Sequence, residues 1–213
     1  LSVLNATLFA SLTQLHLLGL QENQLSVLDD PELFASLTNL QTLWLNNNQL
    51  SVLASKLFAT LTQMQTLYLF KNKVSVLDVA LFASLTKLHV LALQENQLSV
   101  LDDPQLFASL IGLQELDLNN NSLSLLDAKL FASLTEMQKL YLHNNHLRVL
   151  DAKLFASLTQ LKLLALHENQ LSVLDEPELF ASLIGLQELD LNNNFLSVLN
   201  ATLFASLTQL HLL

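Results

Sequence analysis

The stretch LQELDLNNNSL, residues 113–123, decides the fold of this chain. Leucines occupy its first, fourth, sixth and last positions, and Asn121 occupies the ninth. Leu116 and Leu118 alternate with polar residues, which is the period of a short strand that buries one face. The same spacing, with Met or Val at a few leucine positions, recurs at residues 15–25, 40–50, 64–74, 88–98, 137–147, 161–171 and 186–196. A further copy begins at Leu210.

A second marker, Leu-Phe-Ala-Ser-Leu or a close variant, lies between these stretches. Its phenylalanines follow one another at 24 or 25 residues: Phe9, Phe34, Phe58, Phe82, Phe107, Phe131, Phe155, Phe180 and Phe204. A segment such as residues 151–158 begins with a capping Asp and carries helix formers, but it is too short for more than a turn or two of helix or 3₁₀ structure. One coil cannot bury its own leucines, so neighbouring coils must bury them for each other.

This pattern resembles the leucine-rich repeat family, in its 24-residue "typical" subclass. The resemblance implies an α/β solenoid with a parallel β-sheet on the concave face and short helical turns or loops on the convex face. It covers residues 1–213 as a single array of eight complete 24- or 25-residue repeats plus partial ends, with no second domain. The subclass is common in extracellular receptors and matrix proteins, which implies an extracellular or cell-surface location. The chain departs from it in lacking Cys-rich caps and the usual Pro and Gly before the Phe.

The asparagine of each repeat has two interpretations. The residues are Asn23, Asn48, Asn72, Asn96, Asn121, Asn145, Asn169 and Asn194. They form either a row of polar ligands or, as the repeat favours, a buried ladder that satisfies backbone groups where the chain turns inward. By the same reasoning the phenylalanines are expected to form a core spine rather than an aromatic binding site.

Composition excludes several classes of protein. The chain is 51% hydrophobic and 13% charged, which excludes disorder, and it has no Cys for disulfides or thiolate sites. A net charge of −10 provides no basic footprint for nucleic acid. Since no stretch of about 18 residues is continuously apolar, no membrane span is expected.

The sequence contains no catalytic constellation. Polar residues recur at regular places instead of converging, and metal-protease, phosphate-loop and nucleophile-elbow motifs are missing. We therefore expect that the protein is not an enzyme and that it has neither a cofactor nor a metal site. Calcium at Asp117, Asn119 and Asn120 is the alternative, but ordinary surface polarity accounts for these residues better because the EF-hand carboxylates are missing.

The expected binding site is the outward side of the strands. Its candidate residues are Trp44, Tyr68, Phe70, Tyr141 and His143. Tyr and Trp are favoured anchors at protein interfaces, although aromatics also cover exposed sheets without a binding role. Glu115, Asp117, Glu188 and Asp190 supply acidic spots on the same face. These residues predict a non-enzymatic module that binds a protein or glycan ligand on this face.

Three sequons begin at Asn5, Asn120 and Asn200. They are glycosylation acceptors only in a secreted eukaryotic protein, and chance sequons are common in an Asn-rich repeat.

The 25-residue copies recur every 73 residues. Charge repeats with the same period, since the 25-residue copies are acidic and the copy after each of the first two is richer in basic residues. Residues 196–213 repeat residues 1–18 letter for letter, and neither end carries a polar capping coil. We expect a segment of a longer array with a capacity for head-to-tail or lateral self-association. The alternative function is therefore a structural protein whose uniform array builds a filament or cell-surface fibre.

Overall fold

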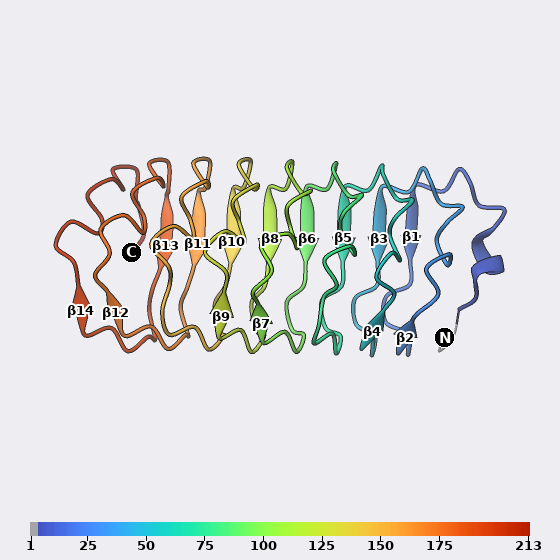
Figure 1. The fold of residues 1–213 in the computed structure, drawn as a ribbon, viewed down its shortest axis with the longest axis horizontal. Coiled ribbons are helices and arrows are strands. Elements are labelled where there is room, and N and C mark those ends of the chain that lie inside the picture. Colours follow the sequence, from blue (N-terminus) through green and yellow to red (C-terminus); the bar gives the residue numbers. More distant parts are fainter. Residues whose placement is uncertain (1–3) are drawn as a thin grey trace.

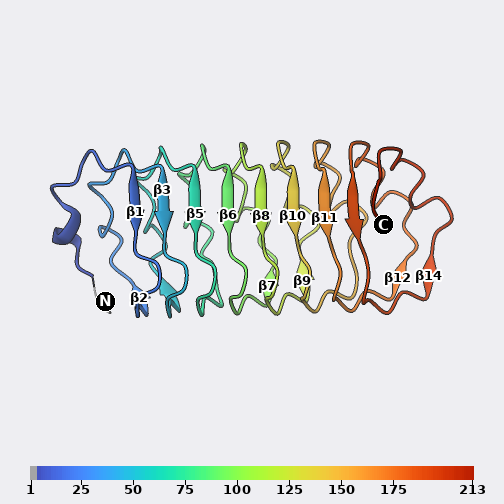
Figure 2. The ribbon, with the colours of Figure 1, turned by 180° about the vertical axis from the view of Figure 1, so that it is seen from behind.

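The computed structural model describes residues 4–213, which form one solenoid of coils stacked along a single axis (Figure 1). Every coil contributes one strand to a parallel sheet with the order β1-β3-β5-β6-β8-β10-β11-β13. Viewed from behind, the strands still lie side by side, and the two ends of the chain lie at opposite ends of the stack (Figure 2). The predicted parallel-sheet solenoid is confirmed; residues 1–3 of the predicted array lie outside the described residues.

The main sheet is built from three-residue strands in strict register. They are β1 (Leu17–Gly19), β3 (Thr42–Trp44), β5 (Thr66–Tyr68), β6 (Val90–Ala92), β8 (Glu115–Asp117), β10 (Lys139–Tyr141), β11 (Leu163–Ala165) and β13 (Glu188–Asp190). The central leucines pair in one line, as Leu116 does with Leu91 and Leu140. The side chains on either side of each central leucine therefore point out of the sheet.

Two-residue strands follow the inward turn in most coils. They are β2 (Val27–Leu28), β4 (Val52–Leu53), β7 (Val100–Leu101), β9 (Leu125–Leu126), β12 (Val173–Leu174) and β14 (Val198–Leu199). They pair as β2 with β4, β7 with β9 and β12 with β14, always across a 25-residue step. The coils at residues 74–77 and 147–150 have no such strand, so this second ladder is interrupted at both.

The side opposite the main sheet consists of turns rather than helices. Over residues 4–213 the structure has one helix, the 3₁₀ helix η1 (Ala6–Phe9). Other coils keep a single turn, in which Leu154 N–H donates to the Asp151 carbonyl at 3.0 Å and the Asp151 carboxylate accepts from Lys153 N–H at 2.8 Å. The capping Asp is thus confirmed, whereas the expectation of helical turns holds only loosely. Within the described residues no helix is long and apolar enough to cross a membrane.

The core consists of stacked leucines and a spine of phenylalanine rings. Leucines facing inward from the strands, such as Leu116 and Leu140, are fully buried. The repeat phenylalanines from Phe34 to Phe180 are likewise inaccessible. Rings of neighbouring coils pack against one another, as Phe131 and Phe155 do with 6.4 Å between their centroids. The predicted spine is confirmed.

The asparagine row is the polar part of this interior. The amide of Asn96 donates to the carbonyls of Leu93 at 3.0 Å and, one coil earlier, of Leu69 at 3.0 Å. Its carbonyl accepts from the N–H of Val74 at 3.0 Å. Asn48 through Asn169 are buried and repeat this pattern, while Asn23 and Asn194 in the terminal coils are half-buried. The ladder interpretation is confirmed, because each asparagine from Asn48 to Asn194 links two coils, and a carbonyl such as that of Leu69 accepts from the amides of two successive asparagines, Asn72 and Asn96.

We expect Asn96→Ala to lower the free energy of unfolding by about 1–3 kcal/mol, because it leaves the buried Val74 N–H without an acceptor and removes one of the two amide donors from each of the Leu69 and Leu93 carbonyls. Gln97→Ala is the matched control, since that neighbouring side chain is exposed and should change stability by less than about 0.5 kcal/mol. Urea unfolding of both variants checks this. Equal stability of Asn96→Ala and the wild type would contradict the ladder.

Candidate binding surface on the strand face

The third residue of each main-sheet strand stands at the centre of the exposed strand face. Along the array these residues are Gly19, Trp44, Tyr68, Ala92, Asp117, Tyr141, Ala165 and Asp190. Because the register is fixed, they form one continuous row at the usual strand spacing of about 4.8 Å. The face is therefore chemically varied although the core beneath it is uniform.

The N-terminal half of the row carries an aromatic patch, Trp44, Tyr68 and Phe70. The rings of Trp44 and Tyr68 stack at 6.5 Å with an interplanar angle of 9°, and Phe70 packs against Tyr68 at 5.8 Å. All three side chains are half-buried. The indole N–H of Trp44 has no hydrogen-bond partner and is shielded from water in the free chain. The structure thus brings together the three aromatics that the sequence placed in adjacent coils.

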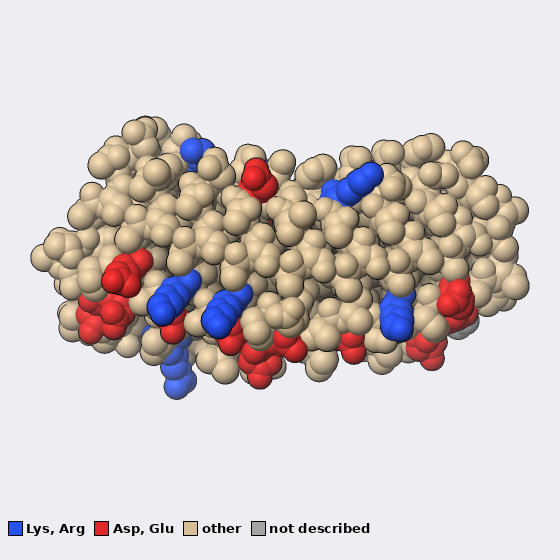
Figure 3. Space-filling view, turned by 45° about the horizontal axis from the view of Figure 1, so that its top comes forward, with Lys and Arg blue, Asp and Glu red and all other residues tan. Residues whose placement is uncertain are grey.

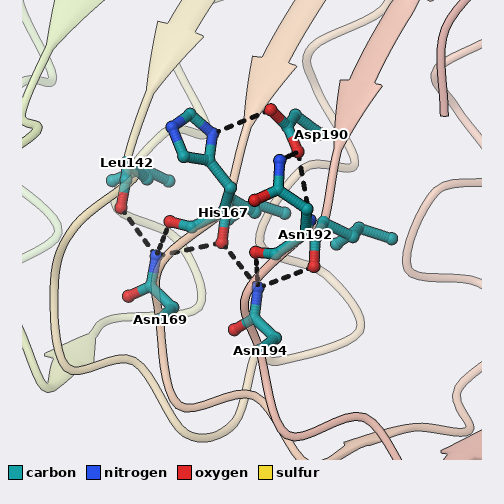
Figure 4. Close-up of polar contacts among 8 residues, drawn as sticks. Leu142, His167, Asn169, Asp190, Asn192 and Asn194 are labelled. Carbon is teal, nitrogen blue, oxygen red and sulfur yellow. Dashed lines mark hydrogen bonds and ion pairs between the residues drawn. The ribbon is translucent and has the colours of Figure 1, made fainter.

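The C-terminal half carries a second cluster, which consists of Tyr141, His143, His167 and Asp190. The imidazoles of His143 and His167 stack at 4.2 Å, and Tyr141 meets His143 edge-on at 6.3 Å. His167 Nδ1 lies 3.1 Å from a carboxylate oxygen of Asp190 (Figure 4). Sequence reasoning selected Tyr141 and His143 but missed His167. The available signal was that both histidines occupy the same position in consecutive repeats.

Burial changes the acid–base properties of this surface. Desolvation raises the pKa of the Asp117 carboxyl from 3.8 to about 6, although hydrogen bonds from Asn119 oppose the change. Desolvation also lowers the pKa of His143, and the neighbouring His167 adds to this effect. The pKa of Lys139 is raised, chiefly by its hydrogen bond to Glu115. Asp117 is therefore a carboxylate held in a poorly hydrated place.

Two hollows interrupt the strand face, each above an alanine. The first hollow, of about 240 Å³, is lined by Tyr68, Phe70, Ala92, Gln94, Glu115 and Asp117. The second hollow, of about 210 Å³, is lined by Tyr141, His143, Ala165, His167, Glu188 and Asp190. In both, a tyrosine from one coil faces a pair of acidic residues two coils further on, and the small alanine between them leaves the space.

The remaining charges gather elsewhere. Figure 3 shows acidic side chains in groups along the lower edge of the molecule, with basic side chains between them and few charges on the rest of that face. Lys71 and Glu95 form one exposed pair at 3.6 Å. Exposed pairs of this kind contribute little to stability, so we assign them no structural role.

The sequon asparagines have local partners. Asn5 and Asn200 cap turns by accepting from the N–H of Thr7 at 3.0 Å and of Thr202 at 2.9 Å. Asn120 is exposed and donates to the side chain of Asn119. At the calcium alternative, the Asn119 amide donates to Asp117 at 2.6 Å. Within residues 4–213, no group of three acidic or histidine side chains is placed to hold a metal ion.

Comparison with known proteins identifies the repeat. Two models described as leucine rich repeat match, one at residues 13–74, 102–147 and 135–179 and the other at residues 185–207. No curated protein matches the chain.

Solved structures of other repeat proteins are similar over almost the whole chain. The TLR13–ssRNA13 complex matches with a TM-score of 0.89 at 30% identity, covering 99% of this chain and 30% of that one. The Toll–Spatzle complex of Drosophila, in its glycosylated form, matches with a TM-score of 0.79 at 25% identity, covering 100% and 33%. An internalin from Listeria monocytogenes shares the fold, with a TM-score of 0.74 at 24% identity, covering 99% and 64%. The chain thus spans less than two thirds of each of these proteins.

The raised pKa of Asp117 predicts a pH-dependent contribution to stability. Between about pH 6 and 3.8 the folded carboxyl holds a proton that the unfolded one has lost, so stability gains as pH falls through this window. Asp117→Asn removes the buried charge and should raise the melting temperature more at about pH 7.5 than at about pH 4.5. Thermal unfolding of this variant and of Asp102→Asn, at an exposed position, checks it. An equal shift at both pH values would refute the burial effect.

Proposed function

The chain belongs to the leucine-rich repeat family, and from this membership we propose that it is a non-enzymatic module that binds a protein partner across its strand face. The fold is commonly used for protein–protein interaction. The aromatic patch Trp44, Tyr68 and Phe70 is the observation that carries the proposal. Large aromatic side chains held rigidly on a sheet provide contact area at low entropic cost, and they dominate the energy of many interfaces.

The state of the patch supports this assignment over a simple covering of the sheet. Trp44 and Tyr68 hold each other in place by stacking, so little ordering is needed when a partner binds. The core positions are almost invariant between coils, whereas the strand-face positions vary, which is where a ligand would be distinguished.

A location outside the cell or at its surface is part of the proposal. Its supports are the resemblance to the extracellular subclass and the glycosylated Toll protein among the similar structures. Asn5 is the best placed of the three glycosylation candidates, because its side chain is exposed and its carbonyl oxygen, not its amide nitrogen, makes the capping bond. Near-identity of the coils also suits a structural array, and the filament alternative stays a prediction.

Site-specific photocrosslinking tests the proposal. A benzophenone side chain at Tyr68 should give adducts with a protein of the extracellular fraction, whereas the same group at Val76 should give none. Val76 is 78% exposed but lies in the second part of its coil, away from the main sheet. Trp44→Ala should weaken the binding of the captured partner by at least about tenfold, as expected for an interface anchor. Adducts that form equally at Val76 would contradict a strand-face site.

A further inference from the structure

We infer that the two hollows of the strand face are equivalent subsites for arginine, and that they take two arginine side chains of one extended basic segment of a partner protein. This rests on the proposed function and specifies the chemistry of the partner. It also assigns a role to the 73-residue period of the sequence.

The equivalence of the hollows follows from their residues. Tyr68, Ala92, Glu115 and Asp117 recur 73 positions later as Tyr141, Ala165, Glu188 and Asp190. Of the other lining residues of the first hollow, Phe70 and Gln94 are replaced by His143 and His167, and Val90 and Leu91 by Leu163 and Leu164, while Leu212 lines the second hollow alone. The tyrosine wall, the alanine floor and the two carboxylates are therefore the constant parts.

These constant parts suit a guanidinium group. Because Trp44 covers one face of the Tyr68 ring, the other face borders the space above Ala92. A planar cation can stack on a tyrosine face while its N–H groups donate to carboxylates. Arginine combines a planar head with forked donors, whereas the compact ammonium of lysine does not. Hollows of 240 and 210 Å³ leave room for such a head group.

Each hollow retains one carboxylate that no basic side chain of the described residues contacts. In the first hollow Lys139 engages Glu115 at 3.2 Å, and one oxygen of Asp117 accepts from Asn119 while the other has no partner among the described residues. In the second hollow His167 pairs with Asp190 at 3.1 Å, and Glu188 has no partner in the described part of the chain. The pair of Lys139 and Glu115 is an example, on this same surface, of a cation held close to a carboxylate.

The burial of Asp117 strengthens the case for a cationic ligand. Its pKa is raised because the ionised form is poorly hydrated, and a bound guanidinium would offset that loss of hydration. An anionic ligand such as RNA would add negative charge to both hollows and is disfavoured.

The spacing of the hollows defines the ligand further. They are three coils apart, which is about 14 Å at the spacing of parallel strands. In an extended polypeptide, side chains four residues apart point to the same side and are separated by about 13 Å. An Arg-Xaa-Xaa-Xaa-Arg segment that runs along the array, across the strands, therefore reaches both hollows at once.

Synthetic peptides of about nine residues test this, with the two arginines four residues apart, three residues apart, or one replaced by serine. We expect the four-residue spacing to bind at least about tenfold more tightly than the single-arginine peptide, since the second contact is intramolecular. Isothermal titration calorimetry at low salt measures the affinities. Binding should also lower the pKa of Asp117, which the ¹³C shift of its carboxyl reports.

Matched variants locate the effect. Asp117→Asn with Glu188→Gln should abolish the advantage of the four-residue spacing. Asp102→Asn with Asp175→Asn removes the same charge at two exposed positions that are also 73 residues apart, and should leave that advantage unchanged. Far-UV circular dichroism confirms that each variant is folded.

Three results would overturn the inference: no dependence on arginine spacing, an equal loss in the Asp102 and Asp175 variant, or competition by single-stranded RNA for the hollows. A crosslinked partner that depends on Trp44 but not on Asp117 and Glu188 would leave the strand-face function intact while rejecting the arginine subsites.

Discussion

The hydrogen bonds of the buried asparagine determine how closely and in what register one coil lies on the next. Each turn that follows a strand directs backbone groups into an interior that is otherwise hydrocarbon, where an unpaired group costs about 1–3 kcal/mol. The amide of Asn121 donates to the carbonyls of Leu118 and, one coil earlier, Leu93, and its carbonyl accepts from Leu98 N–H. No apolar side chain can replace these contacts, and a longer amide would not reach all of them from the same backbone.

A register fixed by the interior leaves the outward positions of the strands free to vary. This is why the chain can carry tryptophan, alanine, aspartate and tyrosine in one row on a sheet whose buried side is nearly all leucine. Variation in side-chain size then makes this surface uneven. An alanine between a tyrosine and an acidic pair produces a hollow without any change in the backbone. The aromatic patch and both hollows are thus surface features of a solenoid whose packing does not depend on them.

The parts of the structure that repeat were predictable from the sequence, and the parts that depend on one neighbour were not. Leucine, phenylalanine and asparagine positions follow from the period, because every copy solves the same packing problem. The stacking of His143 on His167 and the hollow above Ala92 depend on which side chains meet in two particular coils. The left-handed turn after each strand was also invisible, since Lys71, Glu95 and Asn120 occupy it with φ of 52–54° and no glycine marks it. The second ladder pairs only across 25-residue steps, so its gaps follow from the coil lengths that the phenylalanine spacing gives, although no such ladder was predicted.

The 73-residue unit connects the uniform stacking of the coils with the variation of the residues on the strand face. A duplication of three coils preserves stacking, because any coil fits on any other, and it copies the strand-face residues at a fixed distance. A single shallow hollow offers one tyrosine face and one available carboxylate, which is a weak contact in water. Two copies on a rigid scaffold let a ligand that carries the same spacing gain the second contact without a second loss of translational freedom. Under the arginine-subsite proposal, the coils that separate the copies act as spacers, even where their own outward side chains touch nothing.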